Sequence, residues 1–465
     1  MSSQTVDFQL LQRVYLLGIG GIGMSALARY FRRRGLQVAG YDLTPSQLTH
    51  ELESEGMAIH YADSIELIPR DYRLPSASTL VIYTPAVPAG NAEVRYLIAQ
   101  GHTLHKRAEI LGLISRNWAT VAVAGTHGKT TVSTMVAHVL SNTVGCDAIL
   151  GGIAVNTGSN LVLKDRGKGL FVTEADEYDH SFLQLTPAVS VVTAVQADHL
   201  DIYGNLRGVE DAFIEFAMLN QHKKLIVNER TARLFSMLGL QLCTYGLGEQ
   251  ASYRAAKIHY EGLNSRFTVY RSDDAGLDVQ IGLPGRFNVE NTLACIAAVE
   301  AVGVPLEQQL PHLASFKGVR RRFEVRYNSR NLTYVDDYAH HPEEIAAVIQ
   351  AVRVAFPGHR LVVVFQPHLY TRTRDLAVDF ARALAGVDEL LLLPIYPARE
   401  EPIEGVTSGL IAQLLPPSVP CLLLQQSELL PMLESIDFQV LVTMGAGSIG
   451  TMAEAIAELV RLKDC

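Results

Sequence analysis

Residues 121–131 read VAVAGTHGKTT and carry the residue types best suited to binding a nucleotide triphosphate. A short apolar run predicts a strand, Gly125 and Gly128 bracket a tight turn, and residues 132–140 predict a helix. Glycine lets backbone N–H groups approach an anion, and a helix start adds unsatisfied donors and the positive end of the helix dipole. Lys129 can reach terminal phosphates, and the Thr130 hydroxyl can bind Mg²⁺. The pattern favours a phosphate loop, although its G-x-x-G-K-T spacing is two residues tighter than the usual motif.

Two acidic loops follow predicted strands further along the chain. Residues 169–173 and 188–195 are mainly apolar, and they lead into EADEYD at 174–179 and QADHLD at 196–201. Because parallel strands end at one edge of a sheet, we expect these carboxylates to gather beside the phosphate loop. Carboxylate oxygens suit Mg²⁺. A histidine is an unusual ligand for that ion, so His199 is equally well explained as a hydrogen-bonding loop residue.

A second glycine-rich turn, GIGGIG, occupies residues 18–23. A strand is predicted over 13–17 and a helix over 24–34, and Asp42 follows the next predicted strand. This is the form of the dinucleotide fingerprint, in which a diphosphate binds at a helix N-terminus and an acid contacts a sugar or base. Any nucleotide diphosphate satisfies that geometry. NAD, another nucleotide and a purely structural turn therefore all remain open.

Four predicted strands in the last third of the chain end in polar or glycine-rich loops. Asp336 follows residues 332–335, QPHLYTRTRD follows 361–365, and similar loops follow 390–393 and 440–443. Alternating strands and helices predict a second Rossmann-like sheet. Because the four loops share one edge of that sheet, they predict one binding site.

Two other segments carry polar groups with more than one explanation. Residues 320–322 are three arginines, which suit bidentate contact with phosphate or carboxylate but also occur as a solvated face. Asn288 and Asn291 lie near the start of a predicted helix that ends at Ala301, where capping explains at least one of them. Between residues 253 and 280, alternating polar and apolar side chains predict antiparallel strands.

The composition restricts the class of protein. A chain of 465 residues predicts roughly three domains, and 48% apolar with 19% charged residues is typical of a globular protein. A net charge of −9 without a long basic run argues against nucleic acid or an anionic membrane as partner. Five scattered cysteines favour reduced thiols. We find neither a secretory signal nor an apolar run long enough to span a bilayer, and we expect a cytoplasmic protein.

Taken in order, these motifs resemble the Mur ligases. The segments that carry the resemblance run from about residue 13 to about residue 455, and they are GIGGIGMS, GTHGKTT, EADE, ADHLD, RRFE, DDYAHHP and QPHLYTRTRD. The shortened phosphate loop is the usual form in that family. His127 is typical of the members that act on UDP-N-acetylmuramate or on free muropeptide. Leu369 stands where many members have an arginine, which puts more weight on Arg372.

The resemblance implies an α/β protein of three domains. Residues 1–106 are expected to form a Rossmann-like domain that binds the UDP-sugar, and residues 107–315 a P-loop ATP-binding domain with a parallel sheet. Residues 316–465 are expected to form a second Rossmann-like domain that closes over ATP and binds the amino acid.

The resemblance also implies four groups of site residues. The UDP-sugar group is Gly18, Gly20, Gly21, Gly23, Asp42, Thr84 and Arg107. The ATP group is Gly125, Thr126, His127, Gly128, Lys129, Thr130, Thr131, Asn288, Asn291, Arg321, Arg322 and Asp336. The metal ligands are Thr130, Glu174 and His199, and the amino-acid group is Tyr338, His340, His341, His368 and Arg372. The catalytic residues are Lys129, His199 and Arg372.

The reaction that follows from the resemblance is ATP-dependent. L-Alanine is joined to the carboxylate of UDP-N-acetylmuramate through an acyl phosphate, with ATP and two Mg²⁺ as cofactors, in peptidoglycan precursor synthesis. The expected partners are these small molecules, and the chain is expected to be a monomer or homodimer. A murein tripeptide ligase, an NAD-dependent dehydrogenase and a P-loop switch or motor remain as alternatives.

Overall fold

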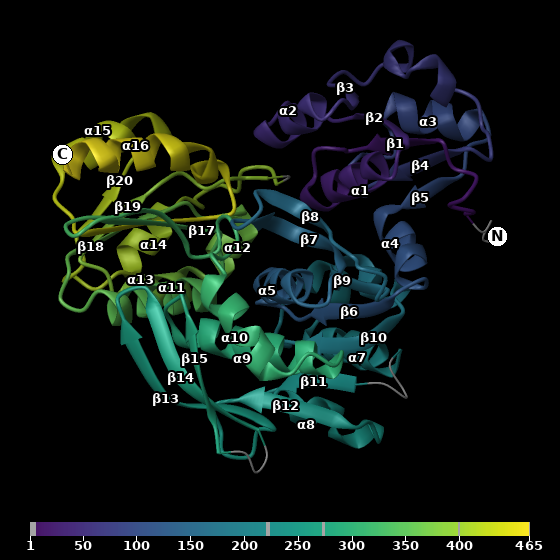
Figure 1. Cartoon of the computed structure of the whole chain (residues 1–465). Helices are drawn as coiled ribbons and strands as arrows, with labels where there is room; N and C mark the ends of the chain where they lie inside the picture. The colour runs from purple at the N-terminus through teal and green to yellow at the C-terminus, as the bar shows by residue number, and fades with distance from the viewer. Residues whose placement is uncertain (1–5, 220–223, 272–274, 399, 465) are drawn as a thin grey trace. The chain divides into compact units, whose positions relative to one another are not determined.

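The computed structural model describes residues 6–219, 224–271, 275–398 and 400–464. The chain divides into two compact units. The first comprises Met1–Arg254, Arg271–Asp273 and Asn291–His312, and the second comprises Ala255–Tyr270, Asp274–Glu290 and Leu313–Cys465. In the described part of the chain the strands form three mainly parallel sheets, and helices follow many of the strands along the sequence (Figure 1). The predicted α/β class is confirmed.

The first sheet is parallel throughout, with strand order β3-β2-β1-β4-β5. Its strands are β1 (Arg13–Leu17), β2 (Gln37–Tyr41), β3 (Ala58–His60), β4 (Thr79–Tyr83) and β5 (Leu104–Lys106). Its helices are α1 (Ile22–Arg33), α2 (Gln47–Ser54), α3 (Ala92–Ala99) and α4 (Arg107–Ser115), with short 3₁₀ turns η1 (Ile65–Leu67) and η2 (Arg70–Tyr72). Because β1 is flanked by β2 and β4, the loops after β1 and β4 lie side by side, where open α/β sheets bind ligands.

Residues of β1 alternate between two cores. Val14 and Leu16 pack with α1, whereas Tyr15 and Leu17 pack with Tyr72 and the α3 side of the sheet. Figure 1 shows α1 and α3 on opposite faces of the strands. The helix predicted over 24–34 begins two residues earlier, because Gly21 is already its N-cap.

The central sheet belongs to the first unit, and its parallel strands surround β6. Reading across it, the order is β12-β11-β10-β6-β9-β7-β8, with only β8 antiparallel to its neighbour. These strands are β6 (Ala119–Ala124), β7 (Asp147–Ala154), β8 (Ser159–Leu163), β9 (Leu170–Glu174), β10 (Pro187–Val192), β11 (Lys224–Asn228) and β12 (Leu242–Gly246). The first residues of β13 (Tyr253–Glu261) extend it beyond β12. β14 (Asn264–Arg271) and β15 (Leu277–Ile281) pair antiparallel, as predicted.

Helices connect the strands of the central sheet in the described part of the chain. They are α5 (Lys129–Asn142), α6 (Leu200–Tyr203), α7 (Leu206–Met218), α8 (Ala232–Phe235), α9 (Arg286–Ala301) and α10 (Leu306–Ser315), with η3 (Tyr178–Gln184) and η4 (Ser236–Leu238). α5 begins at Lys129, three residues before the apolar run that predicted it. Its first turn is formed by the polar end of the phosphate loop.

The third sheet lies in the second unit, with strand order β16-β17-β21-β18-β19-β20. Its strands are β16 (Glu324–Asn328), β17 (Thr333–Asp337), β18 (Leu361–Phe365), β19 (Glu389–Leu392), β20 (Cys421–Leu423) and β21 (Val440–Met444). Its helices are α11 (Pro342–Ala355), α12 (Tyr370–Asp375), α13 (Ala377–Leu384), α14 (Gly409–Leu414), α15 (Leu429–Ser435) and α16 (Ala453–Asp464), with η5 (Gln426–Glu428) and η6 (Ser448–Met452). Because β21 lies between β17 and β18, the loops after these three strands meet at one edge.

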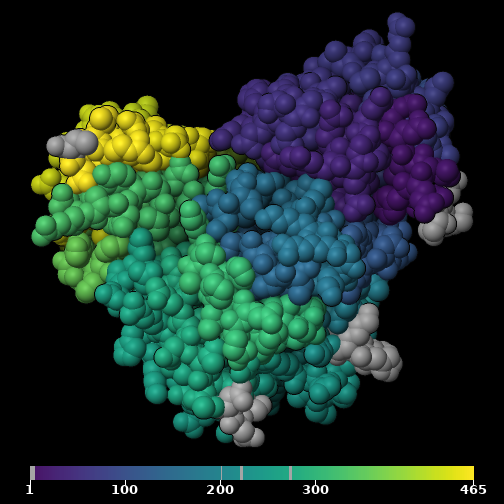
Figure 2. Space-filling view, viewed as in Figure 1, coloured from purple at the N-terminus to yellow at the C-terminus, as the bar shows by residue number. Residues whose placement is uncertain are grey.

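Within the first unit, α1 packs on β7 and β8 of the central sheet. Figure 2 shows the purple residues of the first sheet lying directly on the blue residues of the central one. The buried Asn160 amide joins them, because it donates to the Ile22 carbonyl at 2.7 Å and accepts from Arg29 at 2.8 Å. No helix in the described part of the chain is both long and apolar enough to cross a membrane.

Candidate active site

The predicted phosphate loop lies between β6 and α5. Gly125 has a φ of 132° and Gly128 a φ of 81°, in the region that favours glycine. A Cβ atom on Gly125 would lie 2.0 Å from the Thr193 hydroxyl, so the loop admits no side chain there. Gly128 is the N-cap of α5 and gives the helix no side-chain hydrogen bond. The first N–H groups of α5 can therefore receive an anion.

The rest of the loop is tied to the strand beside it. The Thr193 hydroxyl donates to the carbonyl groups of His127 and Ala124, the latter at 3.1 Å. Thr126 is buried, and its hydroxyl has no hydrogen-bond partner among the described residues. Thr131 lies in the first turn of α5. These contacts hold the loop backbone in the shape that the glycines permit.

Lys129 is held by two acceptors at the loop. Its Nζ lies 2.6 Å from the Gly125 carbonyl oxygen and 2.7 Å from Glu177 Oε1. Burial lowers the pKa of Lys129, but the negative charge of Glu177 and the neighbouring carboxylates outweighs burial, so its pKa is raised. The ammonium group is therefore charged at neutral pH. A phosphate bound in the loop would compete with Glu177 for it.

Glu174 lies directly beside the phosphate loop. The Thr130 hydroxyl donates to this carboxylate, at 3.0 Å from Oε1 and 3.2 Å from Oε2. A Cβ atom on Gly151 would lie 1.6 Å from Glu174 Oε2, so the glycine leaves the space that the carboxylate occupies. Hydroxyl and carboxylate oxygens are the ligands that Mg²⁺ prefers, and the pair fits that ion.

His199 belongs to a second group of possible metal ligands. One donor atom each of Glu177, Asp198 and His199 lie within 4.8 Å of one another. Glu177 Oε2 is buried without a hydrogen-bond partner among the described residues, so this carboxylate can accept a further contact. The His199 ring lies edge-on to Tyr178, with centroids 5.2 Å apart. The structure thus places His199 beside the carboxylate that holds Lys129.

A cavity of about 280 Å³ lies at the N-terminal end of α1, and we call it the α1 cavity. Four of the residues predicted to bind the UDP-sugar line it, namely Gly21, Gly23, Thr84 and Arg107. Glu174 lines it as well. This carboxylate therefore borders both the α1 cavity and the phosphate loop.

Close packing explains the glycines next to the α1 cavity. A Cβ atom on Gly18, which has a φ of 85°, would lie 2.4 Å from Thr84 Cγ2. A Cβ atom on Gly23 would lie 2.4 Å from Arg107 Nη1. The Arg107 guanidinium therefore lies over the start of α1, and its Nη2 donates to Asp176 at 3.1 Å.

Asp42 is engaged by the glycine loop. The Gly20 N–H donates to Asp42 Oδ2 at 2.8 Å, and the Thr44 N–H donates to Oδ1 at 3.3 Å. The acid predicted to contact a sugar or base thus fastens the loop at the end of β2. This contact accounts for the position of Asp42 without any ligand.

The two asparagines of α9 differ in their surroundings. Because α9 begins at Arg286, neither Asn288 nor Asn291 is its N-cap, and the predicted capping role is wrong. A Cβ atom on Gly128 would lie 2.8 Å from Asn291 Oδ1, so Asn291 borders the phosphate loop. Asn288 belongs to the second unit, where its amide donates to the Pro284 carbonyl at 2.8 Å.

In the second unit, Arg321 and Asp336 form an ion pair at the edge of the third sheet. Arg321 Nε lies 3.1 Å from Asp336 Oδ2, and Arg321 Nη2 donates to the Gly445 carbonyl at 2.6 Å. The Thr443 hydroxyl donates to the other Asp336 oxygen at 2.7 Å. Burial raises the pKa of the fully buried Asp336, and Arg321 opposes that rise. Both Asp336 oxygens have protein partners, so this residue joins β17 to β21.

The loops after β17 and β18 bring together the residues predicted to bind the amino acid. The His340 ring centroid lies 5.6 Å from that of His341 and 5.8 Å from that of His368. The ring centroids of Tyr338 and His340 lie 5.3 Å apart. The Arg322 guanidinium carbon lies 5.1 Å from the Tyr338 ring centroid. We call Tyr338, His340, His341, His368 and Arg372 the histidine cluster.

Two rings of the histidine cluster are held neutral near the charge of Arg372. Burial lowers the pKa of His340 to about 3 and that of His368 to about 4, and the charge of Arg372 also lowers both. Both imidazoles are therefore neutral at neutral pH. Arg372 Nη1 and His368 Nδ1 are buried, and neither has a hydrogen-bond partner in the described part of the chain. A buried charged donor without a partner is suited to receive a carboxylate.

Two residues belong to the candidate site by position, although the sequence did not single them out. Glu177 holds Lys129, and its only sequence signal is its place in the acidic loop with Glu174. Gly151 lies within β7, outside any glycine motif, and only the fold reveals that Glu174 needs the space beside it.

Family descriptions match three consecutive segments of the chain. "Mur ligase family, catalytic domain" matches residues 13–119, and "Mur ligase middle domain" matches residues 123–299. "Mur ligase, glutamate ligase domain" matches residues 321–460. The three segments together cover most of the 465 residues.

Individual relatives align over nearly the whole chain. It is 46% identical over 451 residues to the UDP-N-acetylmuramate–L-alanine ligase of Flavobacterium psychrophilum, covering 96% of this chain and 98% of that protein. It is 45% identical over 458 residues to that of Flavobacterium johnsoniae, covering 98% and 99%. The crystal structure of a UDP-N-acetylmuramate–alanine ligase from Thermotoga maritima matches with a TM-score of 0.81 and 28% identity over 97% of this chain and 99% of that one. A murein peptide ligase from Psychrobacter arcticus shares the fold, with a TM-score of 0.68 and 22% identity over 97% and 98%.

Proposed function

Because the chain belongs to the Mur ligase family, we propose that it is an ATP-dependent ligase that joins L-alanine to the carboxylate of UDP-N-acetylmuramate. The structural observation that carries the proposal is the position of Glu174. This carboxylate binds Thr130 of the phosphate loop and also lines the α1 cavity. A γ-phosphate in the loop and a substrate carboxylate in the cavity are therefore neighbours. Identity of 45–46% to alanine ligases over nearly the whole chain supports alanine as the amino acid.

The reaction proceeds in two steps. A carboxylate oxygen of UDP-N-acetylmuramate attacks the γ-phosphorus of ATP, so that an O–P bond forms, the bond to ADP breaks and an acyl phosphate results. The neutral amine of alanine then attacks the acyl carbon, a C–N bond forms and phosphate leaves. The amine proton passes to a base. His199 lies among the carboxylates beside Lys129 and is our candidate for that base, with a ligand of the second Mg²⁺ as its alternative role. A His199→Ala variant that loses metal affinity but keeps its pH–rate profile would assign it to the metal.

The first step brings two negative groups together, so the site must supply positive charge. Lys129 supplies one charge by exchanging Glu177 for the γ-phosphate. Thr130 and Glu174 would hold one Mg²⁺, and the group that contains Glu177 and His199 would hold a second. Bound there, the two ions neutralise the phosphate and carboxylate charges and act as Lewis acids.

The UDP-sugar is proposed to bind along the C-terminal edge of the first sheet. Its diphosphate would lie on the N-terminal end of α1, where Gly21 and Gly23 leave backbone N–H groups accessible. Arg107 adds a guanidinium at the same place, and Thr84 forms the opposite wall. Gly18 and Gly20 shape the loop, and Asp42 holds it closed from β2.

Alanine is proposed to bind in the histidine cluster. Its carboxylate would take the buried Nη1 of Arg372 and Nδ1 of His368, which have no other partner among the described residues. Tyr338, the neutral ring of His340 and the ring of His341 leave room for a small apolar side chain. The same cluster could accept the end of a peptide, so the murein tripeptide ligase is the second candidate function, and the shared fold favours it.

We further propose that the chain divides at residues 106 and 315 into UDP-sugar, ATP and amino-acid domains. We also propose a cytoplasmic location, because the proposed reaction uses small-molecule precursors. ATP is consumed with two Mg²⁺ bound.

The test is phosphate release from ATP with Mg²⁺, UDP-N-acetylmuramate and L-alanine, with each omitted in turn. Release that requires all four supports the proposal. Release that requires free L-alanyl-γ-D-glutamyl-meso-diaminopimelate in place of alanine supports the tripeptide ligase instead. No release with either acceptor contradicts both, and an absorbance change with NADH would then point to the dehydrogenase.

A further inference from the structure

We propose that the chain has a second small-molecule site, which binds a planar aromatic anion at the C-terminal ends of α1 and α4. A cavity of about 530 Å³ lies there, which is within the range of small-molecule pockets. We call it the Arg34 cavity. None of its lining residues belongs to the groups assigned to ATP, the UDP-sugar, alanine or a metal.

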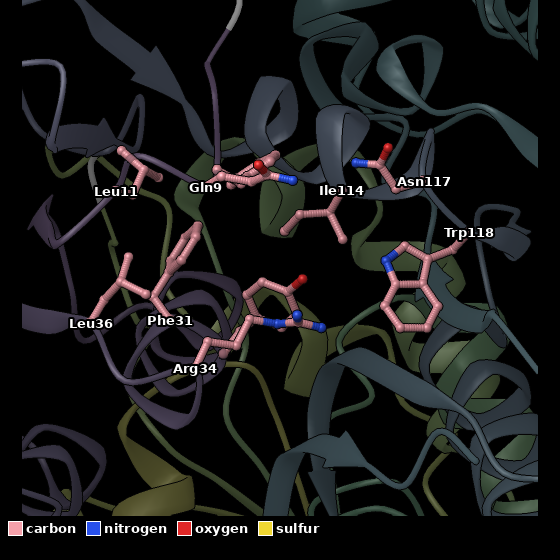
Figure 3. Close-up of a pocket in the computed structure, with 10 residues that line it drawn as sticks. Gln9, Leu11, Phe31, Arg34, Leu36, Ile114, Asn117 and Trp118 are labelled. Atoms are coloured by element: carbon pink, nitrogen blue, oxygen red, sulfur yellow. The ribbon is translucent and has the colours of Figure 1, made fainter. Parts of the chain in front are cut away.

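Aromatic and aliphatic side chains line the Arg34 cavity together with polar ones. Tyr30 and Phe31 contribute rings from α1, Ile114 lies in the last turn of α4, and Trp118 follows that helix. Figure 3 shows Phe31, Arg34, Ile114 and Trp118 arranged around one open space. Aromatic walls favour a ligand that is itself planar and aromatic, because stacked and edge-on ring contacts add to apolar burial.

Arg34 supplies the charge. Its guanidinium carbon lies 4.5 Å from the Tyr30 ring centroid and 5.9 Å from that of Trp118, so the two rings orient the planar group. Only Nη2 is engaged, at 3.3 Å from Asp147 Oδ2, and the other guanidinium nitrogens have no hydrogen-bond partner among the described residues. The Arg34 side chain is 43% exposed, whereas that of Asp147 is 8% exposed.

The charge that the cavity presents is therefore positive. The Asp147 carboxylate points toward the protein interior, and its Oδ1 accepts a hydrogen bond from the Asp165 N–H at 3.2 Å. A guanidinium with free edge nitrogens binds carboxylate, sulfonate or phosphate oxygens in a bidentate manner. Aromatic walls and one oriented guanidinium together select a planar ring system that carries an acidic group.

The Arg34 cavity and the α1 cavity lie at opposite ends of the same two helices. Gly23 at the start of α1 and Arg107 at the start of α4 line the α1 cavity. Arg34 at the end of α1 and Ile114 near the end of α4 line the other. α1 has 12 residues and so spans about 18 Å. A ligand in the Arg34 cavity contacts both helices without overlapping the α1 cavity.

The test uses 1-anilinonaphthalene-8-sulfonate, an aromatic anion with a planar naphthalene ring, with the full-length protein. Trp118 is the only tryptophan in the chain, so excitation of tryptophan reports ligand near this cavity by energy transfer. We expect saturable energy transfer from Trp118. Arg34→Met should weaken binding about tenfold or more, because charge-assisted hydrogen bonds are lost. Arg33→Met is the matched control, since Arg33 is exposed and does not line the cavity.

Two further measurements separate charge from apolar affinity and from misfolding. N-phenyl-1-naphthylamine lacks the sulfonate. We expect it to bind more weakly, with an affinity that Arg34→Met does not change. Asn117→Asp places a negative charge on an exposed residue that lines the cavity. It should weaken binding of the sulfonate dye and leave binding of the uncharged dye unchanged. The proposal would be overturned if both dyes bound with equal affinity. It would also be overturned if the wild type, Arg34→Met and Asn117→Asp bound the sulfonate dye equally well.

Discussion

The phosphate loop and the histidine cluster satisfy their charged groups in opposite ways. At the phosphate loop, Lys129 is paired with Glu177, and Thr130 donates to Glu174. In the histidine cluster, the charge of Arg372 lowers the pKa of His340 and His368, and its buried Nη1 has no hydrogen-bond partner among the described residues. At the phosphate loop, protein carboxylates occupy the donors that a ligand would use. In the histidine cluster, a buried donor has no partner among the described residues.

This difference separates the two roles that charge plays here. The phosphate loop must stay folded around a buried ammonium group when no nucleotide is bound, and an acid that also serves the reaction keeps that charge neutralised. The histidine cluster leaves Arg372 Nη1 without a hydrogen-bond partner in the described part of the chain, so a small carboxylate can take that contact without displacing a protein group from it. Substitutions should therefore affect stability in the first region and substrate affinity in the second.

The largest effect is expected at Lys129. Lys129→Met should lower the rate of phosphate release about 1000-fold, because the charge that faces the γ-phosphate is lost. It should also lower the melting temperature, since Glu177 is left buried and unpaired. Adding Glu177→Gln should restore the melting temperature but not the rate. Lys224→Met, at an exposed lysine, is the control. An unchanged melting temperature in Lys129→Met would contradict the claim that substitutions at the phosphate loop lower stability.

A smaller effect, confined to one substrate, is expected at Arg372. Arg372→Met should raise the KM for alanine about 100-fold, because a buried charge pair with the substrate carboxylate is lost. The KM values for ATP and UDP-N-acetylmuramate should stay within about twofold, and the melting temperature should not fall. Arg374→Met is the matched control, because Arg374 is exposed and pairs with Asp375. Equal effects of both substitutions on the alanine KM would rule out the assignment of Arg372.

Gly151→Ala tests the space beside Glu174. The added Cβ would overlap Glu174 Oε2, so the carboxylate must move away from Thr130. We expect about a tenfold lower rate, with a higher Mg²⁺ concentration at half-maximal activity, as is typical when groups around a metal ligand are perturbed. Gly90→Ala is the control, since nothing lies within 4 Å of a Cβ there. A normal Mg²⁺ dependence in Gly151→Ala would remove Glu174 from the metal site.

The smallest effect concerns pH. The folded-state pKa of His340 is about 3, below the ordinary value of 6.5, so between these values the unfolded chain binds more protons. Stability should fall as pH drops from 6.5 toward 3, by at most about 1.4 kcal/mol per pH unit for this group. His340→Gln should therefore make the melting temperature less sensitive to acid. His50→Gln, at a side chain that is 64% exposed, should leave the slope unchanged, and an equal change in both variants would contradict the assignment.

The sequence predicted the strands and their loops well because their signals are local. The apolar run at 361–365 gives β18 with its predicted bounds, and the glycines of the phosphate loop have the positive φ values that their spacing demands. Helix starts were predicted less well. α5 begins at Lys129 because polar residues of the loop form its first turn, and a pattern of apolar residues does not register them.

The parts of the site that the sequence did not predict depend on contacts between distant segments. Glu177 meets Lys129 across 48 positions of the chain, and Gly151 is explained only by its neighbour Glu174 on another strand. Asp42 accepts a hydrogen bond from the Gly20 N–H in the glycine loop, a contact that residue type and spacing do not indicate, and its contact with a sugar or base stays a prediction.

The most direct test of the account follows oxygen in the first step. UDP-N-acetylmuramate labelled with ¹⁸O in its carboxylate is incubated with ATP, Mg²⁺ and L-alanine, and the released phosphate is analysed by mass spectrometry. If Glu174 brings the carboxylate to the γ-phosphate, a labelled oxygen moves into the phosphate as the acyl phosphate forms and breaks. Unlabelled phosphate, released together with the amide product, would contradict the account.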